Sequence, residues 1–165
     1  MIANKGEKRF AEIDEMTSAI LRFPGERLAI FTCSFGSADV GYYDVVGTRG
    51  NLRLENAYEY AGKMRCVTTI DGEKSQKTFK AGNQFAPELI YFSDCIINDR
   101  VPEPSGKEGL ADVRVINALY ESAEIGQPVN IEQVPKRRRP NEKMVIKRPA
   151  VKEPKLVSAK SPQSS

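Results

Sequence analysis

The chain has 165 residues, a formal net charge of +3, 40% hydrophobic residues and 28% charged residues. This length supports one domain with a real core, and no apolar run approaches the ~20 residues that a membrane-spanning helix requires. Residues 1–15, MIANKGEKRFAEIDE, lack the apolar stretch of a signal peptide. The three cysteines, Cys33, Cys66 and Cys95, are widely spaced and have no histidine partner, because the chain has no histidine. We therefore expect a cytoplasmic protein with reduced, mostly buried thiols and no metal site.

The charge is distributed unevenly along the chain. From Val134 onward, ten lysines and arginines face two glutamates, which leaves this segment with a charge of +8. Residues 1–133 hold 15 basic and 20 acidic side chains and therefore carry −5. The sequence thus predicts a mildly acidic folded part and a strongly basic tail.

Residues 13–35 predict a β-hairpin. Two alternating apolar series flank a turn, as expected for strands with one buried face. Pro24 presets φ for this turn, and Gly25 can adopt the positive φ of a type II turn. The alternating residues are Ala19, Leu21 and Phe23 before the turn and Ala29, Phe31, Cys33 and Phe35 after it.

Further strands follow, separated by turn signals. The tetrapeptide Gly47–Gly50 indicates a tight turn, and Asp71-Gly72 is a strong signal for a type I′ hairpin. The strands that we expect are residues 42–46, 51–55, 58–61, 64–70 and 75–79.

Two helices follow the strands. Between Asn83, which can cap the first helix, and Asn98, near which it should end, one apolar stripe recurs at three- and four-residue spacing. Ser105 and Glu108 form a capping-box pattern at the start of the second helix, which Gly126 should end. The first stripe is Phe85, Leu89, Phe92 and Ile96, and the residues expected to point inward on the second helix are Leu110, Val113, Ile116, Leu119, Tyr120 and Ala123.

The local signals predict an α+β fold, a mostly antiparallel open sheet with two principal helices packed on one face. We expect a last short strand at residues 128–133, so that the folded domain spans residues 1–133. Residues 134–165 hold half of the chain's ten prolines among lysines and arginines. Such a segment builds no core, and we expect it to be extended or disordered.

Three stretches carry a family resemblance. They are the Phe23–Glu26 turn with LAIFTCSFG at 28–36, VVGTRGNLRLE at 45–55, and the two helical patterns with their connection over 82–129. In this order they resemble the C-terminal domain of the Gfo/Idh/MocA oxidoreductases, most closely the glucose–fructose oxidoreductase-like branch, over roughly residues 10–157. The resemblance implies the sheet order of that family, and a complete member would use NAD or NADP.

The cofactor-binding half of that family has no counterpart in this chain. No two glycines are spaced i, i+2, so the G-x-G-x-x-G loop that approaches a pyrophosphate is absent. The resemblance implies a Glu-Lys-Pro lysine and a D-x-x-x-[HY] histidine or tyrosine as proton carriers, and neither motif lies in this part of the family's sequence. We therefore assign no catalytic, cofactor-binding or metal residue, and we expect the chain to be a truncated, split or excised part of such an enzyme.

One loop of the family's substrate cleft has a counterpart. In relatives, the connection after the second hairpin strand approaches the bound sugar, and here it is Gly36–Gly41. Its polar side chains, Ser37 and Asp39, are substrate-facing candidates, since sugar hydroxyls favour such groups. An ordinary polar loop is the competing interpretation.

Alternation places one of each adjacent tyrosine pair, such as Tyr42 and Tyr43, on either face of the sheet. One helix layer covers only one face, and in the family the open face forms subunit contacts. We therefore expect a homo-oligomer through the open sheet face; a face made polar by Arg49, Arg53 and Lys63 is the competing interpretation.

The basic run at 136–139 could bind nucleic acid, but no aromatic residue is interleaved to stack on bases. Relatives carry a proline-rich tail of similar layout along the domain surface, and docking of the tail on the acidic body is favoured over nucleic-acid binding. The preferred role is the substrate-side and oligomerisation domain of an NAD(P)-dependent sugar or cyclitol oxidoreductase, inactive alone. A separate nucleotide-binding chain would complete it. The alternative is a non-catalytic protein-interaction module that uses the open sheet face and the basic tail.

Overall fold

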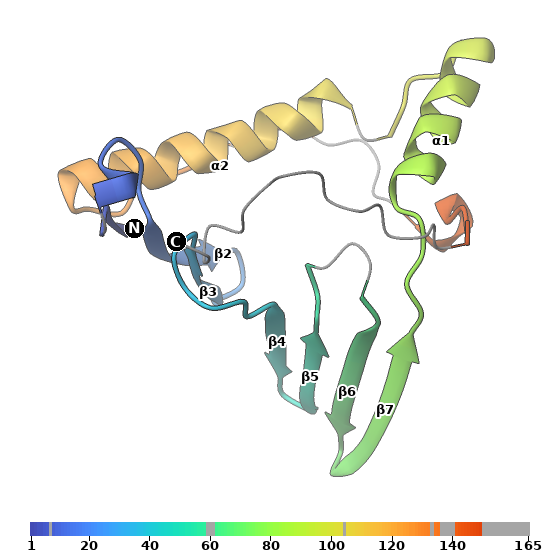
Figure 1. The fold of residues 1–165 in the computed structure, drawn as a ribbon, viewed down its shortest axis with the longest axis horizontal. Coiled ribbons are helices and arrows are strands. Elements are labelled where there is room, and N and C mark those ends of the chain that lie inside the picture. Colours follow the sequence, from blue (N-terminus) through green and yellow to red (C-terminus); the bar gives the residue numbers. More distant parts are fainter. Residues whose placement is uncertain (7, 59–61, 104, 133, 136–140, 150–165) are drawn as a thin grey trace. The chain divides into compact units, whose positions relative to one another are not determined.

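The computed structural model describes all of the chain except residues 7, 59–61, 104, 133, 136–140 and 150–165. The described residues divide into two compact units. The first unit holds residues 1–38 and 103–135, and the second holds residues 39–102 and 141–149. Figure 1 shows the elements of both units.

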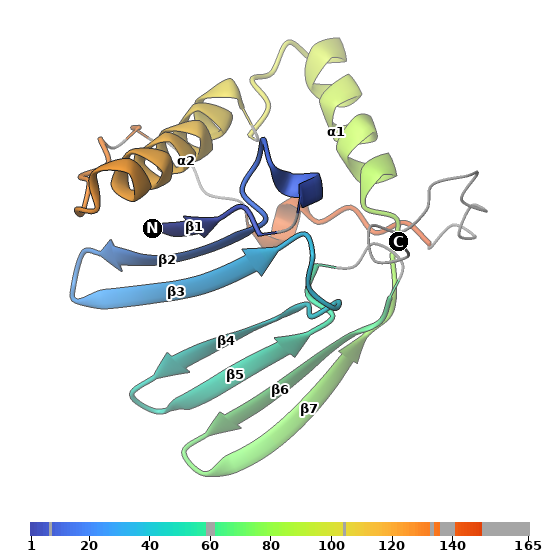
Figure 2. The ribbon, with the colours of Figure 1, turned by 60° about the vertical axis from the view of Figure 1, so that its left-hand side comes forward.

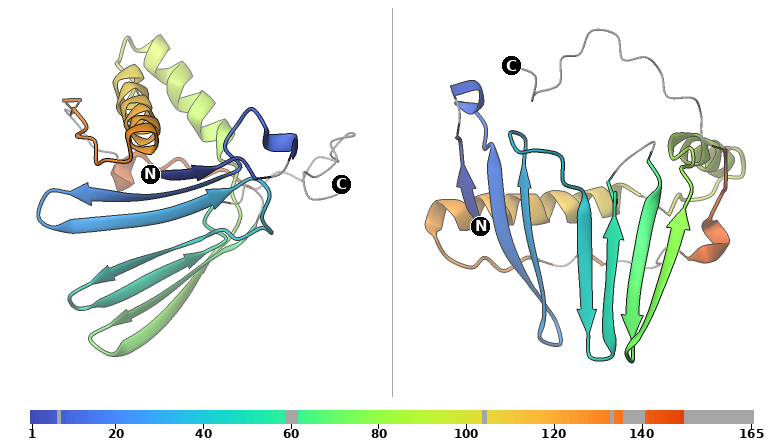
Figure 3. Two further views of the ribbon diagram at one scale, coloured as in Figure 1. Left: turned by 90° about the vertical axis from the view of Figure 1, so that its left-hand side faces the viewer. Right: turned by 60° about the horizontal axis from the view of Figure 1, so that its bottom comes forward.

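The first unit combines a three-stranded antiparallel sheet with one long helix. Its strands are β1 (Ile2–Asn4), β2 (Met16–Phe23) and β3 (Arg27–Ser34), in the order β1-β2-β3. Helix α2 (Gly106–Ile125) crosses one face of this sheet (Figure 3), and the terminal amine of Met1 donates to Ser122 Oγ at 2.9 Å. A short 3-10 helix, η1 (Lys8–Phe10), connects β1 to β2.

The predicted hairpin of residues 13–35 is confirmed as β2 and β3, with Ala19 opposite Phe31. Gly25 has φ 75°, as the predicted turn requires. Ala19 and the ring of Phe10 are buried, and the Phe10 and Phe35 rings stack with centroids 6.4 Å apart. Phe10 and Ala19 are the buried hydrophobic residues among the described residues of the first unit, whereas Phe35 is 65% exposed.

The second unit is built on a four-stranded antiparallel meander (Figure 2). Its strands are β4 (Tyr42–Gly47), β5 (Gly50–Glu55), β6 (Met64–Ile70) and β7 (Glu73–Phe79), paired in chain order. Asp71 and Gly72 both have positive φ, 52° and 86°, so the predicted type I′ turn is confirmed. The strand expected at 58–61 lies mostly outside the described residues, and Tyr58 itself is in a turn.

Helix α1 (Phe85–Ile97) follows β7. Asn83 Oδ1 accepts hydrogen bonds from the backbone N–H groups of Phe85 and Ala86 at 3.1 and 2.9 Å, so the predicted cap is confirmed. The helix ends at Asn98, as expected. Cys95 is its one buried residue, whereas the predicted apolar stripe, Phe85, Leu89, Phe92 and Ile96, is exposed.

A described part of the tail belongs to the second unit. Gly82 and Pro149 form an antiparallel bridge, and the Asn83 N–H donates to the Arg148 carbonyl at 3.4 Å. The 3-10 turn η2 (Glu142–Met144) precedes this contact. Residues 141–149 are therefore held against the start of α1 by their backbone.

The α+β class and antiparallel pairing are confirmed, and the strands divide into two sheets with residues 35–41 between them. Four details of the sequence prediction are wrong. Residues 128–132 form no strand; instead, Arg114 reaches this segment, pairing with the Glu132 carboxylate at 3.1 Å. Ser105 makes no side-chain cap bond, because its backbone carbonyl accepts from the N–H of Glu108 at 2.9 Å.

The other two errors concern burial. Six residues of α2 were expected to point inward. Four of them are about half exposed, namely Leu110, Val113, Ile116 and Tyr120, and the other two, Leu119 and Ala123, are half-buried. The reason is that α2 has apolar residues on two sides. Of the three cysteines, all free, Cys33 is exposed and only Cys95 is buried. Cys33 lies on β3, opposite Thr17.

Candidate functional site

The four-stranded sheet has two chemically different faces. Side chains alternate between the faces of a strand, and residues directly opposite one another on paired strands share a face. The register therefore gathers Tyr43, Val45, Leu52, Leu54, Met64, Cys66, Ile70 and Phe79 on one side, here called the apolar face. The other side, here called the charged face, carries Tyr42, Asp44, Val46, Asn51, Arg53, Glu55, Arg65, Val67, Thr69 and Lys74.

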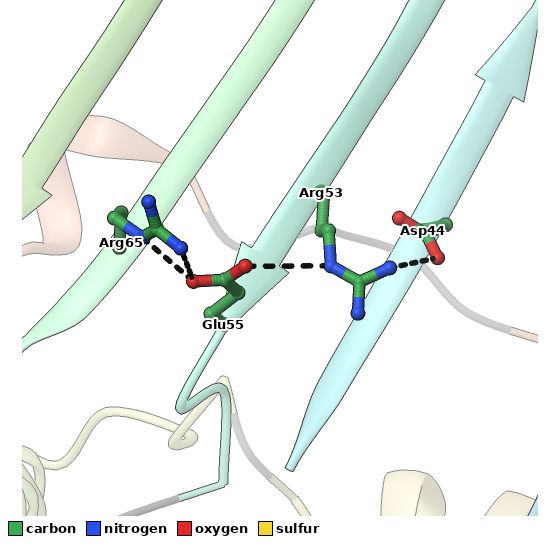
Figure 4. Close-up of polar contacts among 4 residues, drawn as sticks. All are labelled: Asp44, Arg53, Glu55 and Arg65. Atoms are coloured by element: carbon green, nitrogen blue, oxygen red, sulfur yellow. Dashed lines mark hydrogen bonds and ion pairs between the residues drawn. The ribbon is translucent and has the colours of Figure 1, made fainter. Parts of the chain in front are cut away.

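Four side chains of the charged face form one continuous chain of ion pairs (Figure 4). Arg53 lies opposite Asp44 in the β4–β5 pair, and its Nη1 donates to Asp44 Oδ2 at 3.1 Å. Glu55 lies opposite Arg65 in the β5–β6 pair, and Arg65 Nε donates to Glu55 Oε2 at 2.6 Å. Arg53 Nε lies 3.5 Å from Glu55 Oε1 and joins the two pairs.

An aromatic ring supports the central arginine. The Cζ atom of Arg53 lies 3.8 Å from the centroid of the Tyr42 ring, a cation–π contact. Tyr42 and Arg53 are diagonal neighbours across the β4–β5 pair, within reach of long side chains. The planar guanidinium thus makes one stacked contact and two ionic contacts, which the ammonium group of a lysine would not reproduce.

The charged face is partly exposed and slightly hollowed. The four ion-paired side chains are between 30% and 49% exposed, so solvent weakens each ion pair. A shallow depression of about 510 Å³ lies over the face and is lined by the four paired residues together with Val46, Asn51, Val67, Thr69 and Lys74.

A further ion pair lies at the turn end of the same sheet. Arg49 Nη2 and Asp71 Oδ2 are 2.5 Å apart, and Arg49 Nε donates to Asp71 Oδ1 at 3.3 Å. The Asp71 carboxylate raises the pKa of the Arg49 guanidinium, which stays charged throughout the neutral range. Both side chains are more than half exposed, so solvent weakens this ion pair more than those of the charged face.

The charged face is poorly equipped for acid–base catalysis. Both of its paired carboxylates, Asp44 and Glu55, already accept from guanidinium groups, and the chain has no histidine to carry a proton. Within the described part of the chain, no group of three or more histidine, cysteine, aspartate or glutamate residues could hold a metal ion. The sequence has no two glycines spaced i, i+2, as the G-x-G-x-x-G loop of dinucleotide-binding domains requires.

The two substrate-facing candidates lie in the connection that separates the units. Ser37 follows β3 in the first unit; its N–H donates to Ser34 Oγ at 3.2 Å, and its hydroxyl donates to the Ala38 carbonyl at 3.4 Å. Asp39 begins the second unit and is exposed. Both side chains are thus on the surface of irregular chain, where a ligand could reach them.

Sequence reasoning found only part of the charged face. It named Arg53 as a residue that makes one sheet face polar, and the register confirms that Tyr42 and Tyr43 lie on opposite faces. It missed Asp44, Glu55 and Arg65. The signal that could have found them is the pair of tight turns, Gly47–Gly50 and Asp71-Gly72, which fix the register of their hairpins.

Sequence comparison assigns the family. Residues 3–131 match the Gfo/Idh/MocA oxidoreductase family, specifically its C-terminal alpha/beta domain. The chain belongs to this family. The match covers more than half of the chain; it begins within β1 and contains strands β2–β7 and both α-helices. The resemblance read from the hairpins and helices is therefore confirmed.

Three relatives match part of their length to this chain. The chain is 28% identical over 127 residues to a D-xylose 1-dehydrogenase [NADP(+)] of Haloarcula marismortui, covering 76% of this chain and 35% of the relative. It is 26% identical to D-xylose 1-dehydrogenase (NADP(+)) 2 of Haloferax volcanii, over 79% of this chain and 41% of the relative. An uncharacterized oxidoreductase of Rhizobium meliloti is 32% identical to the chain, and the aligned region covers 69% of this chain and 36% of the relative. The chain thus matches little more than a third of the length of these relatives.

Neither α1 nor α2, nor any other helix among the described residues, is long and apolar enough to cross a bilayer.

Proposed function

We propose that this chain is the substrate-side and oligomerisation domain of an NAD(P)-dependent sugar or cyclitol oxidoreductase, and that it is catalytically incomplete alone. One observation carries the proposal: the chain matches the C-terminal domain of the family over residues 3–131 and corresponds to 35–41% of the length of two D-xylose dehydrogenases. The absence of a glycine-rich dinucleotide loop and of any histidine supports the incompleteness.

The substrate class that we favour is an aldose. Two relatives act on D-xylose by name, and both names specify NADP. On our proposal, Ser37 and Asp39 face the sugar in the complete enzyme, where the serine hydroxyl can donate to or accept from a sugar hydroxyl and the carboxylate can accept from one. Hydride transfer requires the cofactor bound by another polypeptide segment or by a separate nucleotide-binding chain.

The oligomerisation role rests on the sheet of the second unit. Its two faces differ in chemistry, and large apolar side chains such as Val45 and Ile70 remain half exposed on the apolar face. A contiguous patch of exposed apolar side chains can mark contact with another protein. We propose that the partner is a second copy of the same chain.

Two experiments test the proposal. The first mixes the purified chain with D-xylose and NADP or NAD and follows nicotinamide absorbance; we expect no hydride transfer, and sustained turnover by the chain alone contradicts the proposed incompleteness. The second titrates D-xylose into isotopically labelled chain and follows amide chemical shifts, with glycerol as the control. We expect weak, saturable shifts confined to residues near 36–41, weakened by Asp39→Ala. Shifts identical to those with glycerol would remove the substrate-facing role.

A further inference from the structure

The carboxylate of Glu15 fills the gap between two glycines of the first unit. A Cβ atom added at Gly36 would overlap Glu15 Oε1 and would lie 2.8 Å from the Glu15 Cδ atom. A Cβ atom added at Gly6 would overlap Glu15 Oε2 and would lie 2.7 Å from the same Cδ atom. Each carboxylate oxygen therefore occupies the space that a side chain would need on one of the two glycines. All three residues lie within residues 1–38 of the first unit.

The backbone of Glu15 is joined to the same two segments. Its N–H donates to the Asn4 carbonyl at 2.8 Å, and its carbonyl accepts from the Phe35 N–H at 2.9 Å. Asn4 Oδ1 in turn accepts from the Gly6 N–H at 3.1 Å, and Phe35 immediately precedes Gly36. Glu15 is half-buried, so its backbone and its side chain together hold Gly36 beside the start of β2.

Gly36 opens the connection that carries the candidate residue Ser37. The N–H groups of Gly36 and Ser37 both donate to Ser34 Oγ, each at 3.2 Å. Gly36 is half-buried, whereas Ser37 is exposed, so the exposed hydroxyl is attached directly to the held glycine. A polar group contributes most to binding when its place is fixed beforehand, because less of the chain must then become ordered on binding.

We propose that Glu15 is a positioning residue for the candidate sugar-binding loop and acts on Ser37 through Gly36. This inference rests on the proposed substrate-facing role of Ser37. The carboxylate acts by its length and shape, since its two oxygens fill the open sides of two glycines. Glutamine has the same length and shape and should replace it, whereas aspartate is one methylene group shorter and should not.

Amide hydrogen exchange in the sugar-free chain tests the positioning by itself. We expect Glu15→Ala and Glu15→Asp to accelerate exchange at the Gly36 and Ser37 amides about tenfold, because both N–H groups lose their fixed place against Ser34 Oγ. Glu15→Gln should stay within about twofold of wild type. The matched control is Glu12→Ala, which removes an exposed carboxylate three residues earlier and should change neither amide. Unchanged exchange in the alanine and aspartate variants overturns the inference.

Titration of D-xylose into the same isotopically labelled variants tests the consequence for binding. We expect the sugar affinity of Glu15→Ala and Glu15→Asp to fall about tenfold, and that of Glu15→Gln to stay near the wild-type value. Circular dichroism and urea unfolding verify the fold of each variant, and Glu15→Asp carries the test if Glu15→Ala does not fold. Equal weakening by Glu15→Gln and Glu15→Asp would overturn the inference, because shape would then not be what positions the loop.

The outcome for the wild type separates this inference from the proposal on which it rests. A wild type that binds D-xylose with the same affinity as a folded Glu15→Asp variant overturns the positioning role of Glu15 alone. A wild type without saturable chemical-shift changes contradicts the substrate-facing role of the loop, and the positioning role fails with it.

Discussion

The guanidinium of Arg53 lies over the Tyr42 ring, with Cζ 3.8 Å from the ring centroid, while it also pairs with Asp44 and Glu55. Replacing Arg53 with alanine removes all three contacts. Exposed ion pairs and cation–π contacts each contribute a fraction of a kcal/mol, so the expected loss is about 1 kcal/mol of unfolding free energy.

Urea unfolding measures this loss. Arg53→Lys keeps the charge but loses the stacked, forked geometry, and it should fall between wild type and Arg53→Ala. Arg49→Ala, at the more exposed pair with Asp71, should cost less than Arg53→Ala. Equal losses of unfolding free energy for Arg53→Ala and Arg49→Ala would mean that the chain of ion pairs on the charged face contributes nothing beyond an ordinary surface ion pair.

The start of β5 depends on a glycine. Gly50 has φ 155°, and a Cβ atom at this position would lie 1.8 Å from the Thr69 carbonyl oxygen on β6. We predict that Gly50→Ala costs about 3 kcal/mol or more, because neither backbone can move without breaking the β5–β6 pairing. A midpoint of thermal unfolding within a degree of wild type would show that this tight approach is absent.

Gly109→Ala is the matched control. Gly109 lies inside α2, and an added Cβ there meets no atom within 4 Å. Alanine is the better helix former, so this variant should gain up to about 1 kcal/mol. The two substitutions are chemically identical, and their opposite effects isolate the backbone geometry at Gly50.

The two helices differ in the side-chain hydrogen bonds that cap their N-termini. Asn83 accepts two backbone N–H groups at the start of α1, whereas the Ser105 side chain accepts none at the start of α2. Asn83→Ala should therefore cost about 1 kcal/mol, and Ser105→Ala should cost clearly less. Chemical denaturation of both variants measures the difference, and a larger loss at Ser105 would reverse the assignment of the caps.

The described part of the tail is attached through its backbone. Deleting residues 141–165 removes the Asn83–Arg148 hydrogen bond and the Gly82–Pro149 bridge, and should lower the stability of the segment around α1. Hydrogen exchange at the amides of Asn83 and Phe85 should accelerate in the deletion variant. Lys147→Gln with Arg148→Gln keeps the backbone and should preserve protection; loss of protection in that variant would mean that charge, not backbone pairing, holds the tail.

The turns and helix ends that the sequence predicted correctly depend on single residues or adjacent pairs. The hairpin turns at Pro24-Gly25 and Asp71-Gly72 are set by residues that adopt unusual φ, and both are found as expected. The Asn83 cap and the Gly126 stop, with φ 66°, are likewise properties of single residues. Such features need no knowledge of the rest of the fold.

What could not be predicted depends on contacts distant in sequence. Strand β1 has three residues and exists through its pairing with β2, so its own pattern gave no signal. The chain of ion pairs from Asp44 to Arg65 can be seen only when the register of the β4–β5 pair is combined with that of the β5–β6 pair. Helix α2 has apolar residues on two sides, so periodicity alone did not decide which side would be covered.

The most direct test of the central claim is the molar mass of the purified chain by light scattering, measured for the full chain and for residues 1–133 over a range of concentrations. The proposed oligomerisation domain predicts, for both forms, at least twice the mass of one chain, which is 18.4 kDa for the full sequence. Association in both forms would locate the contact in the folded domain. A folded monomer in both forms at every concentration would contradict the claim.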